Sequence, residues 1–179
     1  MEAIPVIKGS VGWRVLGVPM IFHWSFPLMG LSISLFVAML FFSSSASLAI
    51  QAFIWTAASL VSLVIAHELG HALAARAFSM QVSAIVIANI GGMCLMDAFP
   101  SARAAFVVSA SGIVVQMALF ALTVGLLSIF GAPTTLPLKC IVMVFTAGNV
   151  FITILNLLPY GARDGARMLQ ALRAMWAGH

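Results

Sequence analysis

Long apolar stretches, interrupted by a few polar or charged residues, dominate the hydrophobic pattern of this 179-residue chain. A helix needs about 20 consecutive, mostly apolar residues to cross the hydrocarbon core of a bilayer. The pattern predicts four such spans, which are separated in part by the polar run at 43–47 and by the breaker sequence Gly131-Ala132-Pro133. The predicted spans cover residues 21–42, 48–78, 104–130 and 138–158.

A further apolar stretch, at 80–97, differs from the spans in composition. Its apolar residues are mostly β-branched and it contains the pair Gly91-Gly92, which favours extended chain over helix. We therefore expect a short reentrant strand or hairpin here, with a backbone that neighbouring helices shield from lipid. After the fourth span, the pattern over 164–177 predicts an amphipathic helix on the inner leaflet.

The composition excludes several classes of protein. Hydrophobic residues make up 63% of the chain and charged residues only 7%, whereas a water-soluble domain carries roughly a quarter charged residues. A soluble globule, a disordered chain and a nucleic-acid-binding module are therefore excluded. The fold class we expect is an all-α polytopic membrane protein, with one domain over residues 1–179.

The few positive charges predict how the chain is oriented, because cytoplasmic flanks of spans collect Lys and Arg. With four spans and a cytoplasmic N-terminus, seven of the eight Lys and Arg residues are cytoplasmic, and only Lys139 is outside. A fifth span at 80–97 would divide the same residues four against four. We therefore expect both termini in the cytoplasm, in the plasma membrane of a bacterial or archaeal cell.

A metal-binding motif lies near the end of the second predicted span, in His67-Glu68-Leu69-Gly70-His71. On a helix, residues four apart share one face, so His67 and His71 can bind one Zn²⁺, with Glu68 as general base. Ionisable residues inside a span are costly and indicate a functional site.

Two histidines leave zinc short of a third protein ligand. No Glu follows Glu68, and Ala74 and Ala77 replace the residues of the longer motif with a third His, so two known classes of zinc protease are excluded. The remaining candidates are His23, Asp97, Asp164 and His179. The second and fourth spans both end on the cytoplasmic side, which favours Asp164. Asp97 is cytoplasmic as well, but it lies in the loop beside Phe99-Pro100, where a solvated charge is its more ordinary role.

The chain resembles the site-2 protease family of intramembrane zinc metalloproteases (peptidase family M50). That family combines H-E-x-x-H with a later N-x-x-P-x-x-x-x-D-G, which appears here from Asn156 through Pro159 to Asp164-Gly165. The resemblance implies that His67, His71 and Asp164 bind one Zn²⁺ per chain and that Glu68 activates a water molecule. It also implies that Asn156 holds substrate backbone, and Gly91-Gly92 resembles the reentrant segment of the family.

Three positions depart from the family pattern. Gly112-Ile113 followed by Gln116 stands where the family often has Gly-Pro and then Asn, and Ala166 replaces the second Gly of Asp-Gly-Gly. None of these departures changes an expected zinc ligand.

The resemblance implies regulated proteolysis of a single-span or membrane-associated protein, with help from a regulatory partner or a prior-acting protease. The β-branched run before Gly91, including Ile87 and Ile90, offers a strand edge to an unwound substrate. Two alternatives remain open from the sequence: a membrane-embedded protein that binds or transports metal, and a catalytically inactive scaffold.

Overall fold

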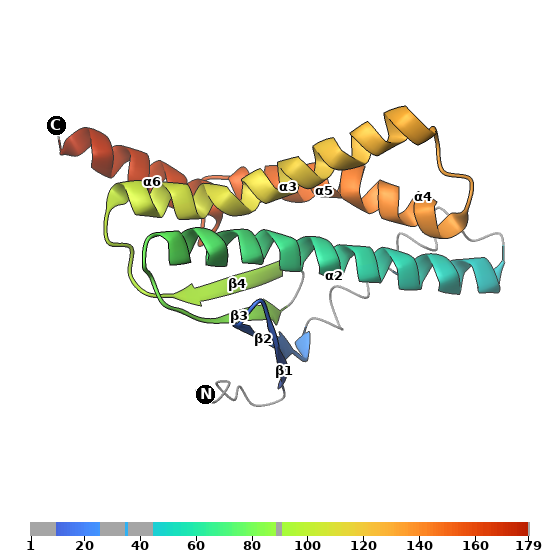
Figure 1. Cartoon of the computed structure of the whole chain (residues 1–179), viewed down its shortest axis with the longest axis horizontal. Coiled ribbons are helices and arrows are strands. Elements are labelled where there is room, and N and C mark those ends of the chain that lie inside the picture. Colours follow the sequence, from blue (N-terminus) through green and yellow to red (C-terminus); the bar gives the residue numbers. More distant parts are fainter. Residues whose placement is uncertain (1–9, 26–34, 36–44, 89–90, 179) are drawn as a thin grey trace.

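The computed structural model describes residues 10–25, 35, 45–88 and 91–178 of the chain. These residues form a mostly helical fold with a small four-stranded sheet beside the longest helix (Figure 1). The sheet lies along one half of that helix, and the remaining helices pack on its other side. The architecture is thus a helical layer with a sheet attached at one end.

The central element is helix α2, Ala46–Ala77, which carries the H-E-x-x-H motif. It begins where the Ser45 side chain accepts a hydrogen bond of 3.2 Å from the backbone N–H of Leu48, which satisfies one of the free donors of the first turn. It ends at Phe78, after which Ser79 adopts a positive φ of 59° and turns the chain toward the sheet.

Two further helical segments complete the bundle. Helix α3, Ala102–Phe130, is capped by Ser101 at its start and by Gly131, with φ of 79°, at its end. The last segment is continuous from Leu136 to Leu157 but changes type along its length. It consists of α4, Leu136–Met143, a π-helical turn η1, Val144–Gly148, and α5, Asn149–Leu157.

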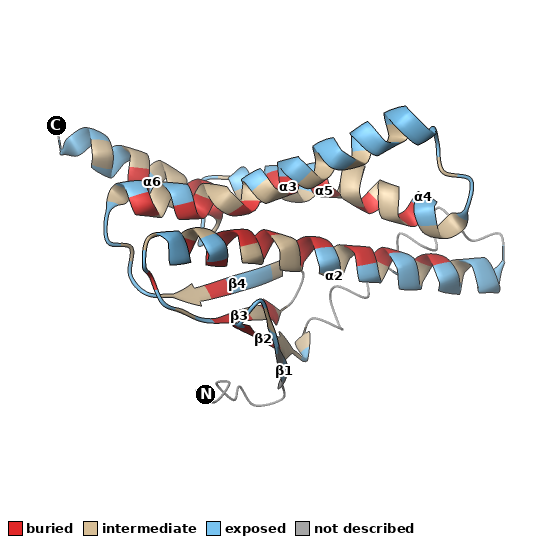
Figure 2. Cartoon of the chain, viewed as in Figure 1, coloured by how far each residue is buried: buried red, intermediate tan, exposed pale blue. Residues whose placement is uncertain are grey.

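Three described helices are long and apolar enough to cross a membrane: Ala46–Ala77, Ala102–Phe130 and Leu136–Leu157. Large apolar side chains are exposed along them, such as Ile129 and Phe130 on α3, which are 74% and 79% exposed. So much exposed apolar surface would be unfavourable in water, whereas the hydrocarbon tails of lipids are a favourable environment for it. The chain is therefore a membrane protein. The exposed surface lies mainly at the end of the bundle away from the sheet (Figure 2).

The sheet corrects the expectation of an all-α protein. Its strands are β1, Ser10–Val15, β2, Val18–His23, β3, Val82–Ala88, and β4, Gly91–Met96, in the order β1-β2-β3-β4. Where a reentrant strand or hairpin was expected, at 80–97, the structure has the antiparallel pair β3 and β4. The two N-terminal strands were not foreseen. Residues 21–23, expected to begin the first span, belong to β2; residues 26–34 and 36–42 of that span lie outside the described part of the chain.

Strand β3 lies inside the sheet, because it pairs with β2 in parallel and with β4 in antiparallel orientation. Its buried side chains, Ile85 and Ile87, pack with Met20 of β2 against Val64 and Ala72 of α2. The sequence predicts that Ile87 borders an open edge of the sheet. This prediction is wrong, because β4 pairs with β3 on that side and is itself the edge of the described sheet.

Helix α6, Asp164–Ala177, follows the loop after Pro159 and packs on the first turns of α3 (Figure 1). Close packing at its start depends on Gly165. A Cβ atom at this position would overlap the backbone carbonyl group of Leu157 at the end of α5. The start of α6 is therefore fixed against α5 by backbone contact.

We predict that Gly165→Ala lowers the free energy of unfolding by about 1–3 kcal/mol, because the added methyl group forces the end of α5 and the start of α6 apart. Thermal unfolding of the detergent-solubilised protein measures the change. Gly125→Ala on α3 is the matched control, since nothing lies within 4 Å of a Cβ there. Equal melting temperatures for Gly165→Ala and the wild type would contradict this packing.

Candidate metal centre

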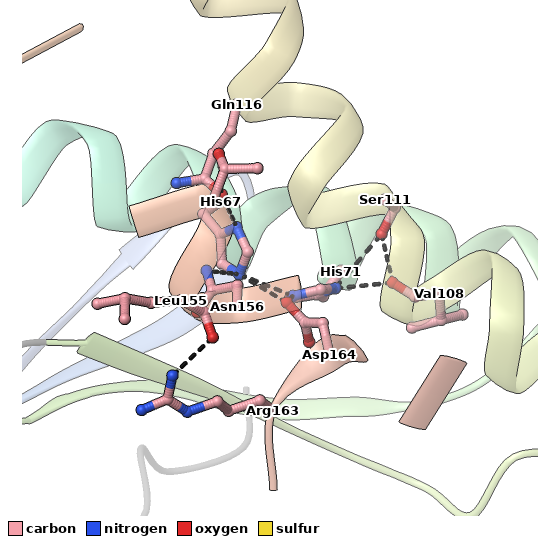
Figure 3. A network of polar contacts seen from close by, with 10 residues as sticks. His67, His71, Val108, Ser111, Gln116, Leu155, Asn156, Arg163 and Asp164 are labelled. Atoms are coloured by element: carbon pink, nitrogen blue, oxygen red, sulfur yellow. Dashed lines mark hydrogen bonds and ion pairs between the residues drawn. The ribbon is translucent and has the colours of Figure 1, made fainter. Parts of the chain in front are cut away.

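Three buried side chains from two distant parts of the chain meet at the motif half of α2. His67 and His71 lie one turn apart, and their Nε2 atoms are 3.1 Å from each other. Oδ2 of Asp164, the first residue of α6, lies 3.1 Å from Nε2 of His67 and 3.3 Å from Nε2 of His71 (Figure 3). The described residues contain one such cluster that could hold a metal ion, and it consists of these three residues.

The spacing of the three donor atoms fits a tetrahedral zinc ion. Zinc bonds to imidazole nitrogen and carboxylate oxygen are about 2.0–2.1 Å long, which places tetrahedral donors about 3.3 Å apart. The observed separations of 3.1, 3.1 and 3.3 Å agree with this value. Three protein donors also leave a fourth tetrahedral position open, as in catalytic zinc sites.

The hydrogen bonds of the two imidazoles point to the same conclusion. Nδ1 of His67 lies 3.0 Å from Oε1 of Gln116, and Nδ1 of His71 lies 2.7 Å from the backbone oxygen of Val108. Because both oxygens are acceptors, each Nδ1 donates, and in a neutral imidazole Nε2 then carries a lone pair. Two lone pairs and the Asp164 carboxylate meet in a buried site, and a cation among them removes their repulsion.

Asp164 is held in place by the loop between α5 and α6. The Arg163 guanidinium donates a 2.6 Å hydrogen bond to the backbone oxygen of Leu155 and lies 4.3 Å from the ring centroid of Tyr160. Because Asp164 is the first residue of α6, this contact with the end of α5 fixes where its carboxylate enters the site.

Two glycines make room for the motif side chains. A Cβ on Gly112 of α3 would lie 2.6 Å from Cε1 of His67 and 2.6 Å from Nε2 of His71. A Cβ on Gly92 of β4 would lie 2.5 Å from Cγ of Glu68. Glu68 itself is buried and stands outside the three-residue cluster, so its carboxylate is available beside a metal rather than on it.

A cavity of about 600 Å³ opens beside the cluster. It runs between α2, β4, the η1–α5 segment and the start of α6. The cavity brings together most of the residues expected at the site, since Glu68, Gly91, Gly92 and Asn156 all line it with the three candidate ligands. The amide nitrogen of Asn156 lies 3.4 Å from Nε2 of His67.

The alternative third ligands do not join the cluster. Oδ2 of Asp97 accepts a 2.9 Å hydrogen bond from the backbone N–H of Gln81, which ties the two ends of the β3–β4 hairpin together. Nδ1 of His23 lies 2.7 Å from the hydroxyl oxygen of Ser25. His179 lies outside the described residues.

Sequence reasoning did not foresee the roles of Gly112 and Gln116 in the site. Gly112 was noted only as the first residue of a Gly-Ile pair and Gln116 only as a departure from a family pattern, yet Gly112 accommodates the imidazoles and Gln116 contacts His67. A signal was present, because the two residues are four apart and share one face of α3. A large amide in the middle of an apolar helix also indicates a buried polar partner.

No protein-family model matches the chain. Two curated proteins are similar in sequence. "Putative zinc metalloprotease Rip3" of Mycobacterium tuberculosis is 29% identical over 188 aligned positions, which cover 99% of this chain and 45% of that protein. "Putative zinc metalloprotease sll0528" of Synechocystis is 32% identical over 120 positions, which cover 65% of this chain and 31% of that protein. The chain thus spans less than half the length of these relatives.

A solved structure shares the fold. The site-2 protease from Methanocaldococcus jannaschii matches 93% of this chain and 72% of its own, with a TM-score of 0.65 and 23% sequence identity. Fold and site together define a membrane protein with a buried His-His-Asp cluster. The chain has the fold of a site-2 protease, and the resemblance to that family indicated by its two motifs is confirmed by these comparisons.

We predict that Asp164→Asn weakens zinc binding at least about 100-fold, because the substitution removes the anionic donor of the cluster. Competition of the purified protein with a chromogenic zinc chelator measures the affinity. Asp97→Asn is the matched control and should bind zinc as the wild type does. Full affinity in Asp164→Asn would transfer the role of third ligand to another group.

Proposed function

We propose that this chain is an intramembrane zinc metalloprotease, which hydrolyses a peptide bond in or near the transmembrane segment of a membrane-tethered regulatory protein. The observation that carries the proposal is Glu68. Its buried carboxylate lines the same cavity as the His67–His71–Asp164 cluster without being part of it. A protein that only stores or moves metal has no use for such a carboxylate.

The donor set favours Zn²⁺ among divalent metals, because two imidazoles and one carboxylate in a closed apolar setting suit its preferred ligands and tetrahedral geometry. The residues that would hold it are His67, His71 and Asp164. When bound, zinc polarises a carbonyl group and acidifies a water molecule at its open position.

The protein residues divide the remaining work of the reaction between them. Glu68 takes a proton from the attacking water and later delivers it to the leaving amine, so its carboxylate alternates between base and acid. The Asn156 amide, 3.4 Å from His67 and on the cavity wall, donates a hydrogen bond to the substrate carbonyl oxygen. Gly92 leaves the space that the Glu68 side chain occupies beside the cavity.

A substrate helix must unwind before a peptide carbonyl can reach Glu68, because a helix hydrogen-bonds its carbonyl groups internally. Strand β4 supplies a replacement for those hydrogen bonds. It ends the described sheet, and its residues 91–94 line the cavity. We infer that an unwound segment of the substrate adds to β4 as a further strand, as peptides do at other open sheet edges.

The charge pattern supports an active site near the cytoplasmic face. Asp164, Arg163 and Arg167 lie together at the cavity wall, and Arg76 lies in the last turn of α2, after His71. Since Lys and Arg collect on cytoplasmic flanks, we place this end of the bundle and both termini in the cytoplasm of a bacterial or archaeal cell. A regulatory partner or a prior-acting protease would then control which membrane-tethered substrates reach the cavity.

We predict that Glu68→Gln retains zinc but lowers the cleavage rate about 100- to 10,000-fold, because the amide cannot accept the proton from water. Co-expression with a candidate single-span substrate, followed by fragment analysis, measures cleavage, and chelator competition measures zinc. Cleavage at the wild-type rate would exclude a metalloprotease. Zinc binding without cleavage in the wild type, towards several tethered substrates, would favour the metal-binding or inactive-scaffold alternatives.

The strand-edge proposal predicts a selective effect at Met93 of β4, which is half exposed and lines the cavity. Met93→Pro removes a backbone N–H from the edge strand, which weakens its pairing with an added strand. The fold should persist, because proline is tolerated in edge strands. Cleavage should fall about 10-fold with zinc still bound. Met93→Leu is the control, since it keeps the N–H and a similar size. Equal rates for the two variants would refute strand addition at this position.

A further inference from the structure

Gln116 is a polar residue in an apolar setting. It lies within α3, a helix long and apolar enough to cross the membrane, and its side chain is fully buried. Its amide oxygen is 3.0 Å from Nδ1 of His67, on the side of the imidazole ring away from the cluster (Figure 3). Gln116 therefore contacts a candidate ligand without belonging to the group that could hold the metal.

Two polar side chains of α5 form hydrogen bonds with Gln116. Nδ2 of Asn149, on α5, donates a 2.7 Å hydrogen bond to the backbone oxygen of Gln116. The Thr153 hydroxyl, one turn further along α5, donates to Oε1 of Gln116 at 3.4 Å. All of these groups are buried, so the chain of contacts runs from α5 through α3 to His67 on α2 without reaching solvent.

We propose that Gln116 is a positioning residue of the metal centre. Its amide oxygen holds His67 in the tautomer with hydrogen on Nδ1 and a lone pair on Nε2, and it fixes the direction in which that lone pair points. Asn149 and Thr153 fix Gln116 in turn. The inference rests on the metal centre proposed above and assigns a role that the sequence motifs do not contain.

The unpaired half of the amide supports this role. Nε2 of Gln116 is buried and has no hydrogen-bond partner among the described residues. An unsatisfied buried donor destabilises a fold. Methionine or leucine would fill the same volume without that cost. What glutamine adds at this position is the oxygen that faces His67.

The two histidines differ in how they are held. His71 is bonded through Nδ1 to a backbone oxygen, that of Val108, which no side-chain substitution removes. His67 depends on a side chain for the same contact. Substitution at 116 therefore tests the orientation of one ligand while leaving the other in place. Partners of this kind affect metal affinity about 10- to 100-fold when they are removed.

The test compares Gln116→Met with Gln116→Glu in the full-length protein purified in detergent. Gln116→Met removes the acceptor and keeps the volume, so its zinc affinity by chelator competition should fall about 10- to 100-fold. Gln116→Glu keeps an oxygen acceptor for Nδ1, so its affinity should stay within about threefold of the wild type. The visible spectrum of the Co²⁺-loaded protein should change in Gln116→Met and not in Gln116→Glu, because it reports ligand geometry.

Thr123→Val is the matched control for losing a polar group on α3, since that hydroxyl bonds within its own helix to Leu119. Its zinc affinity should equal that of the wild type. If Gln116→Met does not accumulate as folded protein, Gln116→Asn takes its place, because it keeps the amide and withdraws the oxygen by about 1.5 Å. The expected loss of affinity is the same.

Two results would overturn the proposal. The first is wild-type zinc affinity in the variant that lacks the acceptor. The second is a loss of zinc affinity in Gln116→Glu as large as that in Gln116→Met, because packing would then be the cause. Either result leaves the protease proposal intact as long as the wild type binds zinc and Glu68→Gln abolishes cleavage. A wild-type protein that binds no zinc would overturn both.

Discussion

The convergence of two imidazoles and one carboxylate inside an apolar bundle is the constraint on which the rest of the structure depends. His67 and His71 come from the last third of a long helix, whereas Asp164 begins a helix about ninety residues later. Ionisable groups are costly at this depth unless they are paired, hydrogen-bonded or bound to a metal. Helices α2 and α6 bring these groups in, and α3 supplies the oxygens that lie against Nδ1 of both imidazoles.

Glycines, which have no side chain, make the close packing around the cluster possible. Gly112 leaves the space that both imidazoles occupy, Gly92 leaves space for Glu68, and Gly165 lets α6 start against the end of α5. Helices that approach this closely in a membrane usually carry small residues at the contact. The glycines are therefore part of the site, although none of them has a reacting atom.

The site was easier to predict from the sequence than the fold around it. Residue spacing on a single helix placed His67, Glu68 and His71 together, and the choice of Asp164 over Asp97 followed from charge and span order. The sheet could not be foreseen in full, because the apolar second half of Val18–His23 reads as the start of a span until β3 pairs with it, Met20 with Ile85, 65 residues later. Gln116 was noticed only as a departure from a pattern, since its meaning depends on a contact with another helix.

The π-helical turn at Val144–Gly148 explains how one continuous helix can present a polar face at the correct angle. Buried positions along it are Cys140, Val144, Asn149 and Thr153, with steps of four, five and four residues. An unbroken α-helix would put Gly148 where the structure has Asn149, and the polar residues would rotate away from Gln116. A π-turn inserts the one extra residue that corrects the register, and such turns recur at functional sites. The irregular turn is thus what lets α5 reach Gln116, and through it His67, from an otherwise apolar span.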